Sequence, residues 1–408
     1  MKVFMSVLRN SRSIRYSYNL YQHSPGAVKA ASVVVYGLKC YLSLARQCDG
    51  KPQLVYFASY PSEHRVLNHV QNNLQAVAHG RITISLRNCF RFAALNEILE
   101  FVPAIARLYR FARRLVQKHH FMPACRIFST VTYYMRFNRL LDEDAKAVFI
   151  ACQYSPECLG LAVAAHQAGK KVLFTNHASA TGETGCVAPM HADLVAVTSQ
   201  AMADLYERHT PHELNIVPFT IAGPQQPMRA LSRDSDALTA GIYLTALTDM
   251  DRLQEIVADL SRHPSIGSVF IRTHPAQVVN ADLSRITGTR VPVEISNAKP
   301  LREDIARTDI AVCGNSTVAI EILRGGRPVL YDHRLDDLVF DYNGYAGYGL
   351  VPEYPETIDD DIFTHIQHHY FSGHWDEKMR YFDSGYQQDE RAIAQRFAAA
   401  VARVMQQA

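Results

Sequence analysis

The 408-residue sequence lacks any stretch that could serve as a transmembrane helix or a secretion signal. No segment approaches the roughly 20 uninterrupted apolar residues that a membrane span requires. The apolar run Val3–Leu8 is followed at once by the basic and polar segment Arg9–Arg15, so no signal-peptide core develops. We therefore expect a cytoplasmic protein whose contact with the inner membrane is at most peripheral.

Paired cysteines are also missing. The eight cysteines include no Cys-x-x-Cys pair and no zinc-finger spacing, and most lie in apolar surroundings. This pattern is typical of reduced core thiols in a cytosolic protein. It indicates neither a disulfide framework nor a structural metal site.

A large excess of charge is absent as well. Lys and Arg number 42 against 39 Asp and Glu, and the net charge of +3 is too small to indicate a nucleic-acid partner. Within a helix expected over Ala93–Gln117 and just beyond it, however, Arg107–Lys118 carries five basic residues and no acid. Helical spacing places several of them on one side. This face is either a solvated surface or a contact for anionic lipid or a phosphorylated, lipid-linked acceptor.

Short apolar runs alternate with helical segments along most of the chain. This alternation predicts βαβ units, with helices covering both faces of parallel sheets. The strands expected in the first half are Gln53–Ala58, Arg81–Ser85, Ala147–Cys152, Lys171–Asn176 and Leu194–Thr198. Those expected in the second half are Ala240–Leu247, Ser268–Thr273, Val291–Ile295, Ile310–Cys313 and Pro328–Tyr331.

The length suits two domains of ordinary size. Pro218–Asp236 has few periodic apolar residues, which is typical of an interdomain linker. We expect an acceptor-binding Rossmann-like domain over 1–222, a nucleotide-sugar-binding one over 237–385, and a C-terminal helix within 386–408 that packs back on the first domain. Ligands of such sheets bind at the carboxyl ends of the strands, so candidate site residues are sought there.

One phosphate-binding pattern follows the strand Ile310–Cys313. Gly314 permits a tight turn, and Asn315, Ser316 and Thr317 offer capping side chains and exposed backbone N–H groups. The start of a helix with such residues attracts anions. The alternative is an ordinary capped helix.

A second pattern, Arg272-Thr273-His274-Pro275, ends an apolar strand about 40 residues earlier. Pro275 stops the strand and holds His274 at its carboxyl end. An imidazole there could donate to a phosphate oxygen and stabilise a departing nucleotide. A histidine at a strand end can equally be structural.

Together these two patterns, with Glu321 and Gly325-Gly326-Arg327-Pro328, resemble the His-Pro and Ser/Thr motifs of bacterial capsule and lipopolysaccharide glycosyltransferases of the GT-B type. That group includes polysialyltransferases, Kdo transferases and teichoic-acid-type polymerases. The resemblance covers about 240–352 and transfers residue by residue to His274, Pro275, Ser316 and Thr317. It implies a GT-B fold with two Rossmann-like domains facing a cleft, whose C-terminal domain holds the donor nucleotide, often CMP. The residues expected at the donor are Arg272, His274, Pro275, Gly314, Asn315, Ser316, Thr317 and Glu321.

Two carboxylates are candidates for catalysis, besides His274. Glu183 lies in a small-residue loop after Lys171–Asn176, which resembles the His-Gly loop of related transferases although Ala178 stands where glycine is usual. Glu183 is either a base toward an acceptor hydroxyl or a surface glutamate. Asp249 follows the strand Ala240–Leu247 and is the candidate nucleophile of a retaining reaction. In an inverting reaction, one of the two is the base.

No metal is expected. Asp249-Met250-Asp251 and Asp234-Ser235-Asp236 match the Asp-x-Asp pattern of another transferase class, but such short acidic patterns are common by chance. In a GT-B enzyme a helix start and basic side chains would neutralise the phosphate.

A tyrosine- and glycine-rich segment, Asp341–Gly349, follows the last predicted strand. Aromatic rings suit the faces of sugars and bases. The segment is either part of the ligand site or an ordinary surface loop.

These patterns and the resemblance favour a glycosyltransferase that moves an ulosonic acid, Kdo ahead of sialic acid, from a CMP-sugar co-substrate to a lipid-linked surface polysaccharide such as O-antigen or capsule. No other cofactor is expected. Three alternatives remain: a GT-B transferase using a UDP-sugar or CDP-alditol, a nucleotide-sugar 2-epimerase, and a non-catalytic glycan- or lipid-binding partner in an assembly complex.

Overall fold

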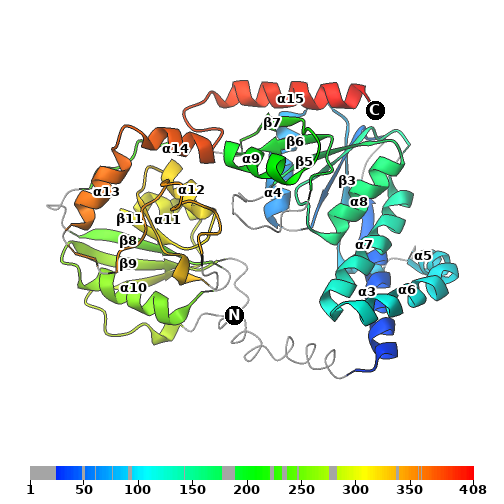
Figure 1. Ribbon diagram of the computed structural model, residues 1–408, viewed down its shortest axis with the longest axis horizontal. Coiled ribbons are helices and arrows are strands. Elements are labelled where there is room, and N and C mark those ends of the chain that lie inside the picture. Colours follow the sequence, from blue (N-terminus) through cyan, green and yellow to red (C-terminus); the bar gives the residue numbers. More distant parts are fainter. Residues whose placement is uncertain are drawn as a thin grey trace.

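Two parallel sheets, one in each of two lobes, organise the chain (Figure 1). The computed structural model describes residues 24–47, 51–59, 61–75, 77–90, 94–141, 143–176, 189–220, 225–231, 237–245, 248–274, 283–336, 340–356, 358–359 and 361–408. Within these ranges, no helix is both long and apolar enough to cross a membrane.

The N-terminal lobe contains a seven-stranded sheet in the order β1-β3-β2-β4-β5-β6-β7. All neighbouring pairs are parallel except β1 with β3. The strands are β1 Leu44–Gln47, β2 Leu54–Ala58, β3 His79–Ile84, β4 Ala147–Ile150, β5 Lys171–Thr175, β6 Leu194–Val197 and β7 Ile216–Pro218. The helices are α3 Gly26–Ser43, α4 Pro61–Asn73, α5 Ala94–Phe101, α6 Ile105–Lys118, α7 Phe121–Leu140, α8 Pro156–Gln167 and α9 Gln200–His209, with 3-10 turns η1 Leu86–Phe90 and η2 Val102–Ala104.

The C-terminal lobe contains a five-stranded, all-parallel sheet in the order β10-β9-β8-β11-β12. Its strands are β8 Leu238–Tyr243, β9 Ile266–Arg272, β10 Val293–Ser296, β11 Ile310–Cys313 and β12 Val329–Tyr331. Its helices are α10 Met250–Arg262, α11 Leu301–Arg307, α12 Val318–Arg324, α13 Ile362–Tyr370 and α14 Trp375–Phe382, with 3-10 turns η3 Leu283–Arg285 and η4 His333–Leu335.

The strands follow from their composition. All four residues of β4 and of β11 are buried, because helices cover both faces of each sheet and leave no side of the strand in water. Each of the ten predicted strands has a counterpart, displaced by at most a few residues. The predicted class, an α/β protein with two Rossmann-like parallel sheets, is confirmed.

One predicted helix is broken. The segment expected as a single helix over Ala93–Gln117 forms α5, the 3-10 turn η2 and then α6. Pro103 lies in that turn, where its ring and its missing N–H prevent a regular helix from continuing.

The last helix, α15 Glu390–Gln406, returns to the N-terminal lobe and lies along its sheet (Figure 1). Phe397 is fully buried in one core cluster with residues of β2, β4 and α4. Its ring lies 5.0 Å from that of Phe219 and 6.2 Å from that of Phe149, measured between centroids. The C-terminal segment is therefore part of the N-terminal core.

The chain passes between the lobes twice, before β8 and after α14, and the two passages are bonded to each other. Gln225 donates to the carbonyl of Gly385 (2.8 Å) and accepts from the backbone of Gln387 (2.9 Å). A side chain on Gly385 would come within 2.6 Å of the Thr220 hydroxyl, so the close approach requires glycine. Arg324 of α12 forms a buried ion pair with Asp383 beside this place.

Replacing Phe397 with alanine tests the packing of α15. We expect Phe397→Ala to lower the free energy of unfolding of the N-terminal lobe by about 3 to 5 kcal/mol, because it opens a cavity in the core. Urea unfolding followed by circular dichroism measures the loss. Fluorescence of Trp375, the single tryptophan, reports the C-terminal lobe separately. The control is Arg396→Ala at an exposed neighbouring position; an equal effect of both variants would contradict the packing.

Candidate functional site

The residues predicted to hold a donor lie at one edge of the C-terminal sheet. Arg272 at the end of β9 pairs with Tyr243 of β8, and Tyr243 pairs with Cys313 at the end of β11. His274 follows β9 and Gly314 follows β11, so only β8 separates them. With strands about 4.8 Å apart, the two segments begin roughly 10 Å from each other. Both segments therefore leave the same edge of the sheet on either side of β8.

The Gly314 turn is built around a carboxylate of the same lobe. Asp336 accepts from the backbone N–H of Asn315 (2.7 Å) and from its side-chain amide (3.1 Å). A side chain on Gly314 would lie 2.7 Å from the Asp336 carboxylate, which explains the glycine. The first N–H of the turn is thus used within the protein.

Asn315 also holds the tyrosine- and glycine-rich loop. Its amide donates to the carbonyl of Phe340 (3.1 Å), and its oxygen accepts from the backbone N–H of Tyr342 (2.7 Å) and from the hydroxyl of Tyr331. The side chain that was predicted to contact the donor is therefore committed to fixing the turn and the loop.

Ser316 and Thr317 stand at the start of α12 and keep partial solvent contact. The Ser316 hydroxyl accepts from the backbone N–H of Val318 (3.3 Å) and retains its own proton for donation. Thr317 is the N-cap residue of α12 but makes no side-chain capping bond. These two hydroxyls are therefore the available donors of this turn.

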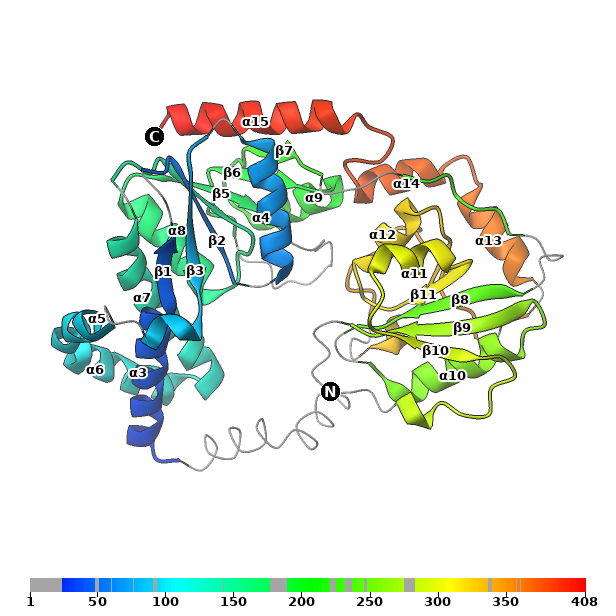
Figure 2. The same ribbon diagram turned by 180° about the vertical axis from the view of Figure 1, so that it is seen from behind.

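Glu321, one turn into α12, faces the other lobe. Its side chain is exposed, yet its pKa is raised, chiefly by desolvation from surrounding protein and against the opposing effect of Arg65, Arg272 and Arg324. Arg65 belongs to α4, which lies on the side of the N-terminal lobe toward the C-terminal lobe (Figures 1 and 2). Glu321 is thus an exposed carboxylate that lies close enough to the N-terminal lobe to interact with the charge of Arg65.

His274 is half-buried, and this burial lowers its pKa. The imidazole is consequently neutral at pH 7 and can donate from one nitrogen. Pro275 lies outside the described residues.

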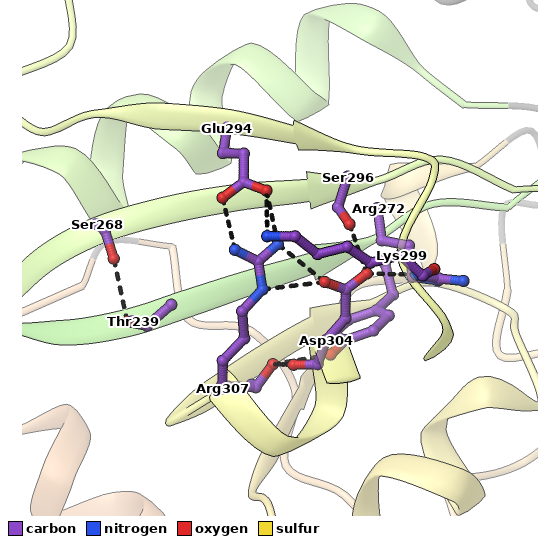
Figure 3. A network of polar contacts seen from close by, with 10 residues as sticks. Thr239, Ser268, Arg272, Glu294, Ser296, Lys299, Asp304 and Arg307 are labelled. Atoms are coloured by element: carbon purple, nitrogen blue, oxygen red, sulfur yellow. Dashed lines mark hydrogen bonds and ion pairs between the residues drawn. The ribbon is translucent and has the colours of Figure 1, made fainter. Parts of the chain in front are cut away.

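Arg272 braces the end of β9 (Figure 3). Its guanidinium pairs with Asp304 and donates to the carbonyl of Lys299 (2.9 Å). Asp304 is fully buried and also accepts from Ser296 (2.7 Å) and Arg307 (3.0 Å). Burial alone would raise the pKa of Asp304, but these hydrogen bonds outweigh it and the pKa is lowered. Arg272 thus has an internal partner and supports the segment that carries His274.

Asp249 caps α10. Its carboxylate accepts from the backbone N–H groups of Asp251 and Arg252, both at 3.0 Å, and its own N–H donates to the carbonyl of Leu335. Glu183 lies in the loop 177–188, which is outside the described residues, as are Asp234 and Asp236. In the part of the chain that is described, no group of three or more His, Cys, Asp or Glu side chains is arranged to hold a metal ion.

Sequence reasoning overlooked a polar cluster at the carboxyl edge of the N-terminal sheet. Ser59, directly after β2, donates its hydroxyl to Glu157 (2.7 Å) and its backbone N–H to Glu63 (2.6 Å). Both glutamates are buried. The sequence signal for this cluster was Ser59, a polar residue directly after an apolar strand. The same criterion had identified His274 and Asp249.

The tyrosine- and glycine-rich loop comes close to the N-terminal lobe. Asn176, at the end of β5, donates to the hydroxyl of Tyr206 (3.1 Å). The pKa of Tyr206 is raised mainly by burial, and the proximity of Tyr342 contributes. Tyr342, whose backbone Asn315 holds, is therefore close enough to Tyr206 of the N-terminal lobe to interact with it electrostatically.

Comparison with solved structures finds a similar two-lobed fold in several proteins. The calicheamicin glycosyltransferase CalG4 is 12% identical, with a TM-score of 0.51 over 87% of this chain and 99% of that one. S. aureus MnaA, solved with UDP, is 8% identical, with a TM-score of 0.51 over 87% and 97%. A putative UDP-N-acetylglucosamine 2-epimerase from Listeria monocytogenes is 12% identical, with a TM-score of 0.50 over 88% and 98%.

The predicted GT-B fold is confirmed by these similarities, which at such low identity concern the fold alone. No protein-family model matches the sequence, and no curated protein matches it. The fold is shared by glycosyltransferases and nucleotide-sugar epimerases.

Replacing Asp304 tests the brace under His274. Its lowered pKa means that its contribution to stability is complete above the ordinary aspartate pKa of 3.8 and is lost as the pH falls further. We expect Asp304→Asn to lower the free energy of unfolding by about 3 kcal/mol at pH 7, because two arginines lose a buried anion. Urea unfolding should show the same loss at about pH 5 and a smaller one near pH 3.

The control for this brace is Glu303→Gln, an exposed carboxylate on the same helix. It should change stability by less than about 0.5 kcal/mol. A loss in Asp304→Asn that stays constant down to about pH 3 would show that the ionised carboxylate is not what stabilises β9.

Proposed function

We propose that this chain is a glycosyltransferase that takes a sugar from a nucleotide donor bound to the C-terminal lobe and passes it to an acceptor bound to the N-terminal lobe. The observation that carries the proposal is the placement of His274 and of Ser316 and Thr317 at one edge of a parallel sheet, with a single strand between them. Ligands of such sheets bind at this edge.

The chemistry at this edge suits a departing nucleotide. The neutral imidazole of His274 donates one hydrogen bond to a phosphate oxygen, and the hydroxyls of Ser316 and Thr317 donate two more. Donors placed where negative charge develops stabilise the transition state of transfer. Glu321, which as a carboxylate only accepts, suits hydroxyl groups of the ribose or the sugar.

The donor that we favour is a CMP-linked ulosonic acid, with Kdo ahead of sialic acid, and the acceptor is a lipid-linked surface polysaccharide such as O-antigen or capsule. This assignment rests on the resemblance of the segments around His274 and Ser316 to capsule and lipopolysaccharide transferases. A UDP-sugar is the competing donor, because the structurally similar MnaA was solved with UDP. A CDP-alditol is a further competing donor, because the same segments resemble teichoic-acid-type polymerases.

A second candidate function is the 2-epimerisation of a nucleotide sugar. It is favoured by the structural similarity to the putative epimerase from Listeria monocytogenes, whose TM-score of 0.50 is close to the 0.51 of the glycosyltransferase CalG4. An epimerase needs no acceptor. Release of free nucleotide that depends on an acceptor glycan would separate transfer from epimerisation.

Nucleotide binding tests the donor site directly. Titration with CMP, UDP and CDP, followed by thermal shift and calorimetry, should show the largest stabilisation with CMP. We expect His274→Ala and Ser316→Ala each to weaken that binding about 10- to 100-fold, because each removes a hydrogen bond to a charged phosphate. Affinity should rise as the pH falls through the lowered pKa of His274, since the imidazolium donates from both nitrogens.

The control for this titration is His365→Ala on α13, an exposed imidazole outside the site. Preference for UDP would overturn the donor assignment. Nucleotide affinity unchanged in both His274→Ala and Ser316→Ala would overturn the site itself.

Asp249 can be tested without damaging its helix. Asparagine caps helices as well as aspartate, so Asp249→Asn should leave the unfolding free energy nearly unchanged. If Asp249 is the nucleophile or the base, acceptor-dependent nucleotide release falls about 10²- to 10⁴-fold. The matched control is Asp251→Asn, whose side chain is 83% exposed. Full activity in Asp249→Asn would leave Glu183, tested in the same way by Glu183→Gln, as the base.

A further inference from the structure

One side of α5 exposes apolar side chains to solvent. Leu95, Leu99 and Val102 are spaced by four and three residues, so they share one side of the helix and its extension η2. They are 61%, 68% and 50% exposed, whereas Phe101 on another side is buried. Ile105, at the start of α6, is also exposed. Several exposed apolar side chains on one side of a helix are typical of an interaction site.

The adjoining helix α6 is basic. Arg107, Arg110, Arg114 and Lys118 recur at helical spacing along one side, and all are exposed. Arg113 adds a fifth exposed positive charge. None of these five side chains forms an ion pair with a residue in the described part of the chain.

Acidic side chains do not cancel this charge. The segment from α5 through α6 contains two acids, Glu97 and Glu100. Glu97 is buried in an ion pair with Arg136, and Glu100 pairs with Arg139. Both arginines belong to α7. The surface therefore combines exposed apolar side chains with uncompensated positive charge.

The two helices lie side by side at the end of the N-terminal lobe that is farthest from the C-terminal lobe (Figures 1 and 2). A flat partner bound there would not lie between the lobes. The donor edge of the C-terminal sheet would stay accessible while that partner is bound.

We propose that this surface, called the α5–α6 surface, docks the protein on an anionic lipid bilayer. Leucines of an interfacial helix enter the boundary between headgroups and acyl chains, and arginines beside them bind lipid phosphates. A nucleic acid would use the arginines but not the leucines. A second copy of the same surface would bring like charges together. Docking goes beyond the proposed function, because it requires neither donor nor acceptor.

Vesicle co-sedimentation of the full chain tests the docking. The protein should bind phosphatidylcholine vesicles that contain about 30% phosphatidylglycerol, bind pure phosphatidylcholine far less, and dissociate at about 0.5 M salt. We expect Arg110→Gln with Arg114→Gln to weaken binding roughly 25-fold, about fivefold for each charge. Leu95→Ser with Leu99→Ser should weaken it at least as much, because the inserted apolar area is lost.

The control is Arg396→Gln with Arg403→Gln, two exposed arginines of α15 on the opposite side of the N-terminal lobe (Figures 1 and 2). This variant should bind like the original chain. The proposal is overturned by absent binding to anionic vesicles, by undiminished binding of the two α5–α6 variants, or by a concentration-dependent dimer that the leucine variant abolishes. The nucleotide titration is run without lipid, so a failure of docking is distinguishable from a failure of the donor site.

Discussion

The carboxylate of Asp336 is the constraint on which the carboxyl edge of the C-terminal sheet depends. It fills the turn after β11, bonds both the backbone and the amide of Asn315, and leaves space at Gly314 only for a hydrogen atom. Through Asn315 it also fixes the start of the loop at Tyr342, which comes close to the N-terminal lobe. A single buried anion thus positions the turn at Gly314 and the start of the aromatic loop.

A second carboxylate, Asp304, stabilises the carboxyl end of β9, as Asp336 stabilises the turn after β11. It holds Arg272 at the end of the strand, two residues before His274. Both carboxylates are nearly or fully buried and have nitrogen donors around them, which is the arrangement that makes a buried charge tolerable. His274, Ser316 and Thr317 therefore stand beside a framework whose two carboxylates already have hydrogen-bond partners within the protein.

The sequence was informative about strands and about the edge that carries the site. Apolar runs bounded by polar residues identified ten strands because burial on both faces leaves a continuous apolar pattern. It did not reveal β1, a four-residue edge strand containing Arg46, or β7, which ends at Pro218. Nor could it reveal that Asn315 binds Asp336, since the pairing of residues 21 positions apart is set by the folded sheet. The capping role of Asp249 was visible in principle, because aspartate before an amphipathic helix is a common N-cap.

The joined passages near Gln225 and Gly385 have a mechanical consequence. If the two chain passages lay at opposite ends of the interface, they would prevent one lobe from rotating against the other. Because they are hydrogen-bonded to each other at one place, the lobes can rotate about that place. The ion pair of Arg324 with Asp383 connects this joint directly to the C-terminal end of α12. A small change of angle at this joint would move the hydroxyls of Ser316 and Thr317, at the other end of α12, toward or away from the N-terminal sheet, so the distance between the two sheet edges is set at a point outside them.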